Sequence, residues 1–574
     1  MTETKFADGV TAPLALAEDE KGNAAASDAL LITSGMLASA LLAGCGGGGG
    51  SDGAAGATPP IAGGANIPAA DASRFLAQAS MGATREQMAR VQTIGYAAWI
   101  DEQFAAPPTT SRWDWLMANG FNAAANVNSE TGFDSSAWLK LLSAPDTLRQ
   151  RVTLALSEML VASISGFVGG GWKQFTGAAY LDLLETNAFG NYRNLLQDVS
   201  TSAPMGEYLT FRGNRKFNAT TGALPDENYA REIMQLFTIG LVKLNIDGTP
   251  TLLNGVAQDT YGQDDIAGLA RVFTGWDYDF AGGTSATPDF KRRPMLQIPS
   301  RHELGAKTFL TTTIPAGTDG VNSLRIALDA LFAHPNIAPF VSRQLIQRLV
   351  CSNPSPAYVA RVATVFNNDG TGVKGNLRAV IKTLLLDSEA RSLPTASSGS
   401  FGKLREPMLR FAAWARAYNA TSPSGAWAIG NTTDPATRLG QSPLRSPSVF
   451  NFFRPGYVPP NSSIAGAGLV APEFQITNES TVVGYINYMQ RAVSLGVGDV
   501  RANYSALLPL ADSAQALVDE VNSVLVAGQI NASSLASIVS AVGSMPGGTD
   551  ANRNNRIYAA LTLALAAPEF IVQK

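Results

Sequence analysis

The chain of 574 residues contains only two histidines and two cysteines. Cys45 and Cys351 are too few for a disulfide framework, and neither lies in a C-x-x-C pair. Any histidine-based triad or metal site would have to use His302 or His334, and the H-E-x-x-H motif of zinc proteases is absent. No phosphate-binding loop is evident, because the glycine run 46–50 is not followed by Lys-Ser or Lys-Thr.

Charge is also sparse. Charged residues make up 15% of the chain and apolar residues 45%, which permits a large core. Lys and Arg number 42 against 46 Asp and Glu, giving a net charge of −4. Without a basic excess, we expect no nucleic acid as the main partner.

The first 70 residues differ from the rest. Residues 29–44 form an apolar run that is shorter than the ~20 residues of a membrane-spanning helix but fits an export signal. Leu42 to Cys45 (L-A-G-C) resembles a bacterial lipoprotein cleavage site, which predicts lipidation of Cys45. Residues 46–70 are rich in Gly, Ser, Ala and Pro, as in a flexible tether.

Residues 1–28 are acidic, whereas a signal normally begins with positive charge, so residues 1–45 are either a lipoprotein-type signal or a disordered tail. The first alternative predicts an exported protein: periplasmic, anchored to the outer membrane or extracellular. Contact with the membrane would then be made only through the lipid.

Residues 71–574 are predicted to be a helical domain, with a possible internal boundary near 395–470. Apolar spacing predicts the following helical segments: 72–78, 84–99, 136–164, 174–200, 226–240, 261–274, 324–351, 356–386, 403–419, 472–494, 503–546 and 554–573. Strand-like alternation is scarce, and residues 311–314 are the best candidate for a short hairpin. The expected fold is all-α, a large multi-helix domain with long loops and at most a short β-hairpin.

The most ordered set of polar residues lies on the predicted helix 226–240. Asn228, Arg231, Glu232 and Gln235 fall at i, i+3, i+4 and i+7, so they line one face opposite the apolar side. This stripe is either a solvated or structural network or a site in which Glu232 is catalytic and Asn228, Arg231 and Gln235 bind substrate.

Two adjacent acids, Asp264 and Asp265, begin the next predicted helix, which ends before Trp276. They either cap this helix or form a carboxylate pair facing Glu232 across a cleft. Paired carboxylates perform the acid/base chemistry of glycoside hydrolysis and can also bind calcium. Trp276 is then a candidate for contact with substrate.

Histidines are so rare that His302, in a loop with Glu303 and Lys307, is a candidate catalytic residue, with Lys307 a candidate for substrate binding. His334 precedes Pro335 and is predicted to cap or punctuate a helix.

The aromatic cluster Phe450, Phe452, Phe453 and Tyr457 is either core packing or a platform for sugar rings.

Seven segments occur in order along the chain: R-F-L-A-Q-A-S-M-G-A-T (Arg74–Thr84), N-A-F-G-N-Y-R-N-L-L (Asn187–Leu196), E-N-Y-A-R-E-I-M-Q-L-F-T-I-G (Glu227–Gly240), D-D-I-A-G-L-A-R-V-F-T-G-W (Asp264–Trp276), H-E-L-G-A-K-T-F-L (His302–Leu310), H-P-N-I-A-P-F-V-S-R-Q-L-I (His334–Ile346) and L-G-Q-S-P-L-R-S-P-S-V-F-N-F-F (Leu439–Phe453). In this combination the chain resembles the bacterial family called domain of unknown function 1800. The resemblance implies a mostly helical, exported protein, often encoded beside an exported protein similar to the phosphatase/sulfatase superfamily. The family has no agreed activity, so the resemblance does not indicate which reaction, cofactor or metal to expect.

Two functions follow as expectations. One is a cell-envelope protein that binds a partner, such as the phosphatase/sulfatase-like neighbour, or an extracellular polymer. The other is a polysaccharide hydrolase or lyase that uses paired carboxylates in residues 225–310.

Overall fold

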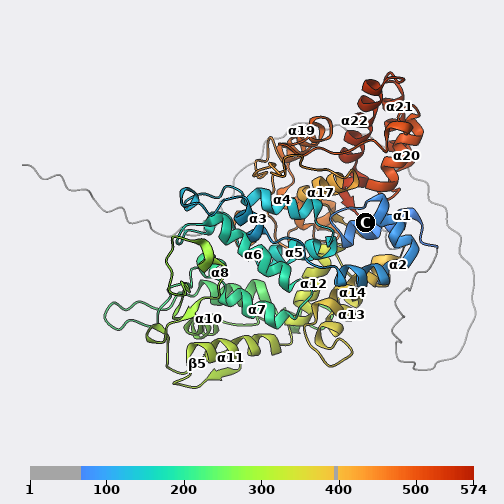
Figure 1. Ribbon diagram of the computed structural model, residues 1–574. Coiled ribbons are helices and arrows are strands. Elements are labelled where there is room, and N and C mark those ends of the chain that lie inside the picture. Colours follow the sequence, from blue (N-terminus) through green and yellow to red (C-terminus); the bar gives the residue numbers. More distant parts are fainter. Residues whose placement is uncertain (1–65, 393–398) are drawn as a thin grey trace, which may run out of the picture. The chain divides into compact units, whose positions relative to one another are not determined.

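Helices make up 53% and strands 6% of the computed structural model (Figure 1), which confirms the predicted, mostly helical class. The structure describes residues 66–392 and 399–574, all of which belong to one compact unit. The predicted signal, Cys45 and most of the predicted tether lie outside these residues. Within the described ranges, no helix is both long and apolar enough to cross a membrane.

The first third of the described chain is helical. Its elements are α1 (Ala69–Ala79), α2 (Arg85–Ala105), α3 (Arg112–Ala118), η1 (Ala124–Asn126), α4 (Phe133–Ser143), α5 (Thr147–Met159), η2 (Ile164–Gly166), α6 (Lys173–Asn187), α7 (Tyr192–Thr201) and α8 (Ala203–Tyr208). Thr84 caps α2 as its position predicts, accepting a hydrogen bond from the amide of Gln87 at 3.1 Å.

The central third mixes short helices with small hairpins. Its elements are α9 (Asn228–Glu232), η3 (Ile233–Thr238), β1 (Leu252–Leu253), β2 (Val256–Ala257), α10 (Gln263–Ala270), η4 (Arg271–Phe273), β3 (Trp276–Asp277), η5 (Pro288–Lys291), β4 (Leu296–Gln297), η6 (Pro299–Arg301), β5 (Lys307–Phe309) and β6 (Thr312–Ile314). Each sheet has two antiparallel strands, and β5 pairs with β6 where the sequence predicts a hairpin.

The last third returns to helices. Its elements are α11 (Gly320–Ala333), α12 (Ile337–Leu349), α13 (Pro356–Asn367), α14 (Leu377–Leu386), α15 (Ser388–Arg391), β7 (Lys403–Leu404), α17 (Pro407–Ala417), α18 (Ser463–Gly466), η7 (Pro472–Ile476), α19 (Glu479–Leu495), η8 (Leu508–Leu510), α20 (Ala514–Leu525), α21 (Ala532–Gly543), α22 (Asp550–Ala566), α23 (Pro568–Ile571) and β8 (Val572–Gln573). Strands β7 and β8 pair although most of the last third lies between them.

Several predicted long helices are in fact pairs. The segment 136–164 is divided between α4 and α5, and 324–351 between α11 and α12. In both cases the residue before a proline ends the first helix in an extended conformation: Ala144 has ψ 131° before Pro145, and His334 has ψ 136° before Pro335. The proline ring disfavours helical geometry in the preceding residue, so the breaks follow from local sterics.

Buried apolar side chains form two large clusters. The larger is built mainly from α1 to α14, and the second mainly from α17 and α19 to α22, with contributions from α4. The change from one cluster to the other falls near residues 401–408, just after the described chain resumes. The buried charged residues Lys403 and Glu406 lie in this stretch.

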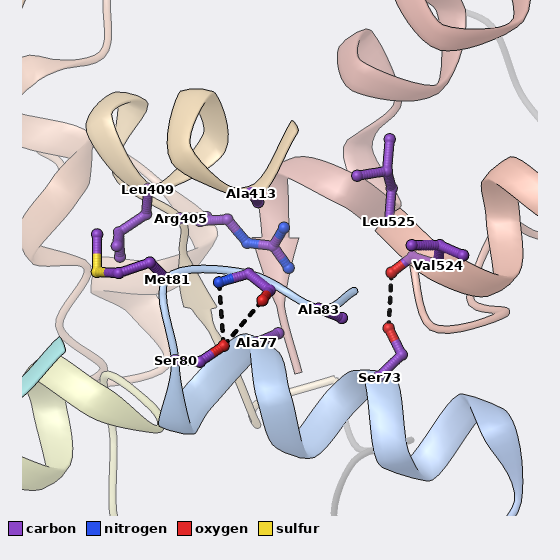
Figure 2. Close-up of a pocket in the computed structure, with 11 residues that line it drawn as sticks. Ser73, Ala77, Ser80, Met81, Ala83, Arg405, Leu409, Ala413, Val524 and Leu525 are labelled. Carbon is purple, nitrogen blue, oxygen red and sulfur yellow. Dashed lines mark hydrogen bonds between the residues drawn. The ribbon is translucent and has the colours of Figure 1, made fainter. Parts of the chain in front are cut away.

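The first family-like segment forms a tight junction between α1, α17 and α20 (Figure 2). Gly82 has φ +142°, and a Cβ at this position would lie 2.5 Å from the Cα of Ala413. The Ser73 hydroxyl donates to the carbonyl of Val524 at 2.8 Å across the same junction. The remaining cavity is about 10 Å³, at or below the room that one water needs, so this junction is packing and not a binding site.

Candidate functional site

A cleft of about 740 Å³ opens between the end of α5, the turn η3, helix α12 and the loop 449–458. Its volume lies in the range of small-molecule and cofactor sites. Its lining is Glu158, Met159, Val161, Gln235, Leu236, Gly240, Leu241, Val242, Leu244, Phe340, Arg343, Gln344, Gln347, Arg348, Val449, Phe450, Arg454, Pro455, Gly456, Tyr457 and Val458.

One wall of the cleft depends on an irregular helix. Residues Ile233–Thr238 form a π-helical turn, and Gln235 and Leu236 from this turn line the cleft. Gly240 then has φ +69°, and a Cβ there would meet the ring of Phe340 at 2.7 Å. Glycine is therefore required for the chain to leave the helix against Phe340. Single π-helical turns are costly and frequently lie at functional sites.

The opposite wall is the loop 449–458. The rings of Phe450 and Tyr457 line the cleft, whereas Phe453 is buried beneath the Arg348 guanidinium, 4.7 Å from the ring centre. Phe452 faces a separate hollow next to Gln475. The predicted aromatic cluster is therefore divided: two rings belong to the cleft and one to the core.

Three arginines place positive charge in the cleft. Arg348 pairs with Glu158 at 3.5 Å. Arg343 and Arg454 form no ion pair with any described residue: Arg343 donates only a long 3.5 Å hydrogen bond to the carbonyl of Gly248, and Arg454 stacks over Phe450 at 4.2 Å. Glu158 is the only acid among the described residues that line the cleft, so the cleft carries an excess of cations.

Two amides in the cleft are also free. The side chains of Gln235 and Gln344 line it, and neither makes a hydrogen bond to another described residue. Gln344 is nonetheless only 8% exposed. Buried amides normally have partners, so these two are available to a ligand in the cleft.

Below the cleft lies a buried network of charges. Lys403 is fully buried and sits 3.0 Å from Glu473 and 3.7 Å from Glu406. It also donates to the carbonyl of Arg348 at 2.8 Å, which ties β7 to α12. The fully buried Arg151 of α5 donates to the same carbonyl at 2.6 Å.

Glu158 and Glu406 make up the centre of this network. Burial, and next the charge of Glu406, raise the pKa of Glu158 well above its usual range. Burial alone would also raise the pKa of Glu406, but Lys403, the hydrogen bond from Glu158, Arg151 and Arg348 together lower it.

Glu232, the predicted catalytic acid, is 7% exposed and is not part of the cleft lining. Its Oε2 atom and the hydroxyl of Tyr261 are buried without a hydrogen-bond partner in the described chain. Burial raises the pKa of Glu232, and the nearby charge of Arg231 opposes the rise.

The structure places the other three residues of the predicted polar stripe, Asn228, Arg231 and Gln235, in different surroundings. Gln235 lines the cleft. Arg231 pairs with Glu227 at 3.4 Å, and the amide of Asn228 donates to Thr210 at 3.4 Å. Among the described residues, no hydrogen bond or ion pair joins these side chains to one another, and their catalytic and substrate-binding roles stay predictions.

Asp264 and Asp265 have different environments. Asp264 is exposed, whereas Asp265 accepts hydrogen bonds from the amide of Gly262 at 2.8 Å and from that of Leu310 at 2.5 Å. Asp265 therefore caps α10, as one of the two predictions stated, and also holds the β5–β6 hairpin. Neither aspartate makes a described contact with Glu232.

His302 and Lys307 meet at a buried serine. Ser323 of α11 lies 3.2 Å from the His302 Nε2 atom and 3.2 Å from the Lys307 Nζ atom, and all three residues are fully buried. The His302 Nδ1 atom lies 3.0 Å from the carbonyl of Thr274. Burial lowers the pKa of both His302 and Lys307. Enclosed on all sides, this cluster ties the loop after β4 to α11. Trp276 is also buried, at 4% exposure.

Sequence patterns did not identify Glu158, Arg348, Lys403, Glu406 or Glu473. Their signal is single charges set within apolar runs, as in A-L-S-E-M-L-V (Ala155–Val161) and L-I-Q-R-L-V (Leu345–Val350). In a chain with so little charge, such residues are either paired in the core or functional. Among the described residues, no group of three or more His, Cys, Asp or Glu side chains is arranged to hold a metal ion.

Comparison with known proteins gives one match. The family model described as "Protein of unknown function (DUF1800)" matches residues 74–572, which is most of the chain. No curated protein and no solved structure matches.

Proposed function

The chain belongs to the DUF1800 family of proteins of unknown function, and we propose that it binds an extended acidic polysaccharide in the cleft between α5, η3, α12 and the loop 449–458. The observation that carries this proposal is the pair of arginines, Arg343 and Arg454, that line the cleft without an ion pair to any described residue. Guanidinium groups bind carboxylate and sulfate groups through parallel hydrogen bonds.

The rest of the lining supports a sugar polymer over a simple anion. The rings of Phe340, Phe450 and Tyr457 offer apolar faces, on which sugar rings stack. The unpartnered amides of Gln235 and Gln344 can exchange hydrogen bonds with hydroxyl groups. The lining comes from four elements, α5, η3, α12 and the loop 449–458, so a polymer would have several groups to contact.

The test is electrophoresis of the full-length chain through native gels that contain polygalacturonate, an acidic polymer, or dextran, a neutral one. We expect retardation by polygalacturonate only, and weaker retardation as salt is raised, because salt screens exposed charges. The Arg454→Gln variant should bind roughly tenfold to a hundredfold more weakly, since a hydrogen bond to a charged group contributes about 1.5–3 kcal/mol.

The matched control is Arg325→Gln, which alters an exposed arginine of α11 that pairs with Asp329 outside the cleft. This variant should bind as the wild type does. Equal retardation by dextran and polygalacturonate, or none by either, would overturn the proposal.

A second candidate is binding of an envelope protein, for which the family resemblance suggests the exported phosphatase/sulfatase-like neighbour. The supporting observation is the β1–β2 hairpin next to the cleft, where Leu252, Leu253 and Val256 are 58%, 62% and 69% exposed. Exposed aliphatic groups of this kind are typical of protein-binding surfaces. Sedimentation of the two purified proteins together tests this candidate. A complex that forms with the wild type but not with Leu253→Ser or Val256→Ser would support protein binding through the hairpin.

We also propose that the chain is exported and anchored through a lipid on Cys45, on the support of the apolar run 29–44 and the L-A-G-C sequence. The experiment is metabolic labelling with a fatty acid. Incorporated label should disappear in the Cys45→Ser variant, and label that persists there would exclude lipidation of this cysteine.

A further inference from the structure

We infer that the hollow that Phe452 faces, of about 510 Å³, binds a neutral sugar of the same polymer whose acidic sugars occupy the cleft. The ligand is then an acidic heteropolysaccharide, in which neutral sugars stand beside acidic ones. The inference rests on the proposed function, because it adds a second sugar position to the polymer proposed there.

The lining of the hollow is polar but almost without charge. Arg445 is the only charged side chain among the described residues that line it. Its guanidinium is already paired, with Asp134 at 2.8 Å and with Glu130 at 3.1 Å, and its side chain is 9% exposed. Within its described lining, the hollow thus has no unpaired cation to attract an anion, whereas the cleft has Arg343 and Arg454.

Three amide side chains supply hydrogen-bond donors to the hollow. The oxygens of Asn431, Gln475 and Asn478 each accept from a backbone N–H, at 2.9, 2.8 and 3.0 Å respectively. The NH₂ group of each side chain, in contrast, donates to no described residue. Each amide is therefore held through its oxygen and keeps its N–H bonds for an acceptor such as a sugar hydroxyl.

Phe452 gives the hollow an apolar face. Its half-buried ring lines the hollow together with Pro435 and Pro447. A sugar ring carries hydroxyl groups at its rim and C–H groups on its faces. An aromatic face with several amide donors and no unpaired charge therefore suits a neutral sugar.

Close packing fixes the walls of the hollow. One wall is the loop that carries Asn431, and the other is the start of α19, which Asn478 caps. Gly484 of α19 lies so close to this loop that a Cβ would fall 2.3 Å from the carbonyl oxygen of Pro435. Because the missing side chain lets the loop rest directly on the helix, the donors are in place before a ligand arrives, and less conformational entropy is lost on binding.

The hollow and the cleft are built from the same two segments. Val161 lines the cleft and Ile164 the hollow, and the amide of Ile164 donates to the carbonyl of Leu444 at 2.9 Å, which joins the segments. Along the second segment, Phe450 lines the cleft and Phe452 the hollow, so their Cα atoms are at most about 7 Å apart. The two sites are thus close enough for nearby sugars of one chain.

The experiment compares two polymers that share their acidic sugar. Polygalacturonate contains galacturonate alone, whereas the debranched backbone of rhamnogalacturonan alternates galacturonate with the neutral sugar rhamnose. Retardation of the full-length chain in native gels gives an affinity for each polymer. The ratio of the two affinities is the preference for the alternating polymer, and it cancels any change that affects both polymers equally.

Two substitutions on opposite sides of the hollow should lower this preference. Phe452→Ala removes the apolar face and Asn431→Ala removes an amide donor, and each should reduce the preference by about threefold to tenfold. Retained binding of polygalacturonate shows that each variant is folded. Phe217→Ala is the matched control, because Phe217 is 49% exposed on a loop outside both concavities, and the preference should not change. Arg454→Gln should weaken the binding of both polymers.

The failure of this inference differs from that of the proposed function. A preference that is unchanged in both Phe452→Ala and Asn431→Ala would overturn the inference, as would a wild type that binds polygalacturonate but not the alternating polymer. Either result would leave acidic polymer binding in the cleft standing. A wild type that binds neither polymer would overturn the proposed function itself.

Discussion

Each buried carboxyl group in this protein takes its properties from the donors within reach. Glu473 has Lys403 at 3.0 Å, whereas Glu232 has a buried oxygen with no donor in the described chain. Burial raises the pKa of Glu232, which means that the folded protein binds its proton more tightly than the unfolded chain does. The contribution of Glu232 to stability is therefore fully present below the unfolded pKa of about 4.3 and is lost as pH rises through the folded pKa.

The Glu232→Gln variant should remove this pH dependence. Relative to the wild type, we expect the free energy of unfolding of the variant to increase as pH is raised from about 4 to 7, by about 1.4 kcal/mol for each tenfold difference in acid dissociation between the two states. Urea unfolding at a series of pH values measures the difference. Parallel curves for the two proteins would contradict the raised pKa.

The same variant tests the predicted catalytic role of Glu232. If polymer cleavage by the wild type is established, a rate that is unchanged in Glu232→Gln excludes Glu232 as acid or base. A rate lowered by about 100-fold or more would instead support a role for Glu232 as acid or base.

At the scale of elements, small polar contacts join helices to hairpins. Asp265 caps α10, and its side chain also accepts a hydrogen bond from the amide of Leu310, in the turn between β5 and β6. Gly268, one turn later, lies so close to β5 that a Cβ would fall 1.8 Å from the carbonyl of Thr308. The geometry of this junction therefore depends on one acid and one missing side chain.

Two adjacent substitutions separate the roles of the acids on α10. Asp265→Ala leaves two amides without their acceptor and should lower the free energy of unfolding by about 1–3 kcal/mol. Asp264→Ala, on the exposed neighbour, should change it by no more than about 0.5 kcal/mol. Thermal or urea unfolding of both variants makes the comparison, and equal losses would show that Asp264 has an unrecognised partner.

Local features of this kind were predictable from sequence. The cap at Thr84, one of the two roles offered for Asp265 and the β5–β6 hairpin depend on residues close together in the chain. Pro145 and Pro335, which divide two of the predicted long helices, are also visible in the sequence. Apolar spacing continues across both prolines, however, and therefore predicted longer helices. The buried charge network could not be predicted, because its pairs, Arg348 with Glu158 and Lys403 with Glu473, join segments whose contacts are set by tertiary packing.

At the scale of the whole molecule, buried charges connect distant parts of the chain. Lys403 contacts Glu406, Glu473 and the carbonyl of Arg348, and all of these groups are buried. Such a network contributes little net stability when intact, because each charge has lost its hydration, but removing one member leaves others unpaired.

Lys403→Met should therefore be strongly destabilising. The change leaves Glu406 and Glu473 without their shared cation, and we expect the free energy of unfolding to fall by about 3–5 kcal/mol. Lys382→Met is the control, because Lys382 also pairs with a carboxylate, that of Asp101 at 2.7 Å, but on the exposed surface. Its loss should cost no more than about 1 kcal/mol. Similar losses of unfolding free energy in the two variants, measured by calorimetry, would mean that the buried network is no more sensitive to loss of its lysine than a surface ion pair is.

The pairing of β7 with β8 has a consequence for the order of events during synthesis. Gln573 of β8 is buried and donates to the carbonyls of Leu349 and Val350 at the end of α12, the helix that carries Arg343 and Arg348. Glu158 and Arg348 leave the ribosome long before residue 573 does. The earlier helices can collapse as they emerge, but the support beneath the cleft is completed only when this late strand arrives. A nascent chain therefore cannot complete the support beneath the cleft until residue 573 has been made.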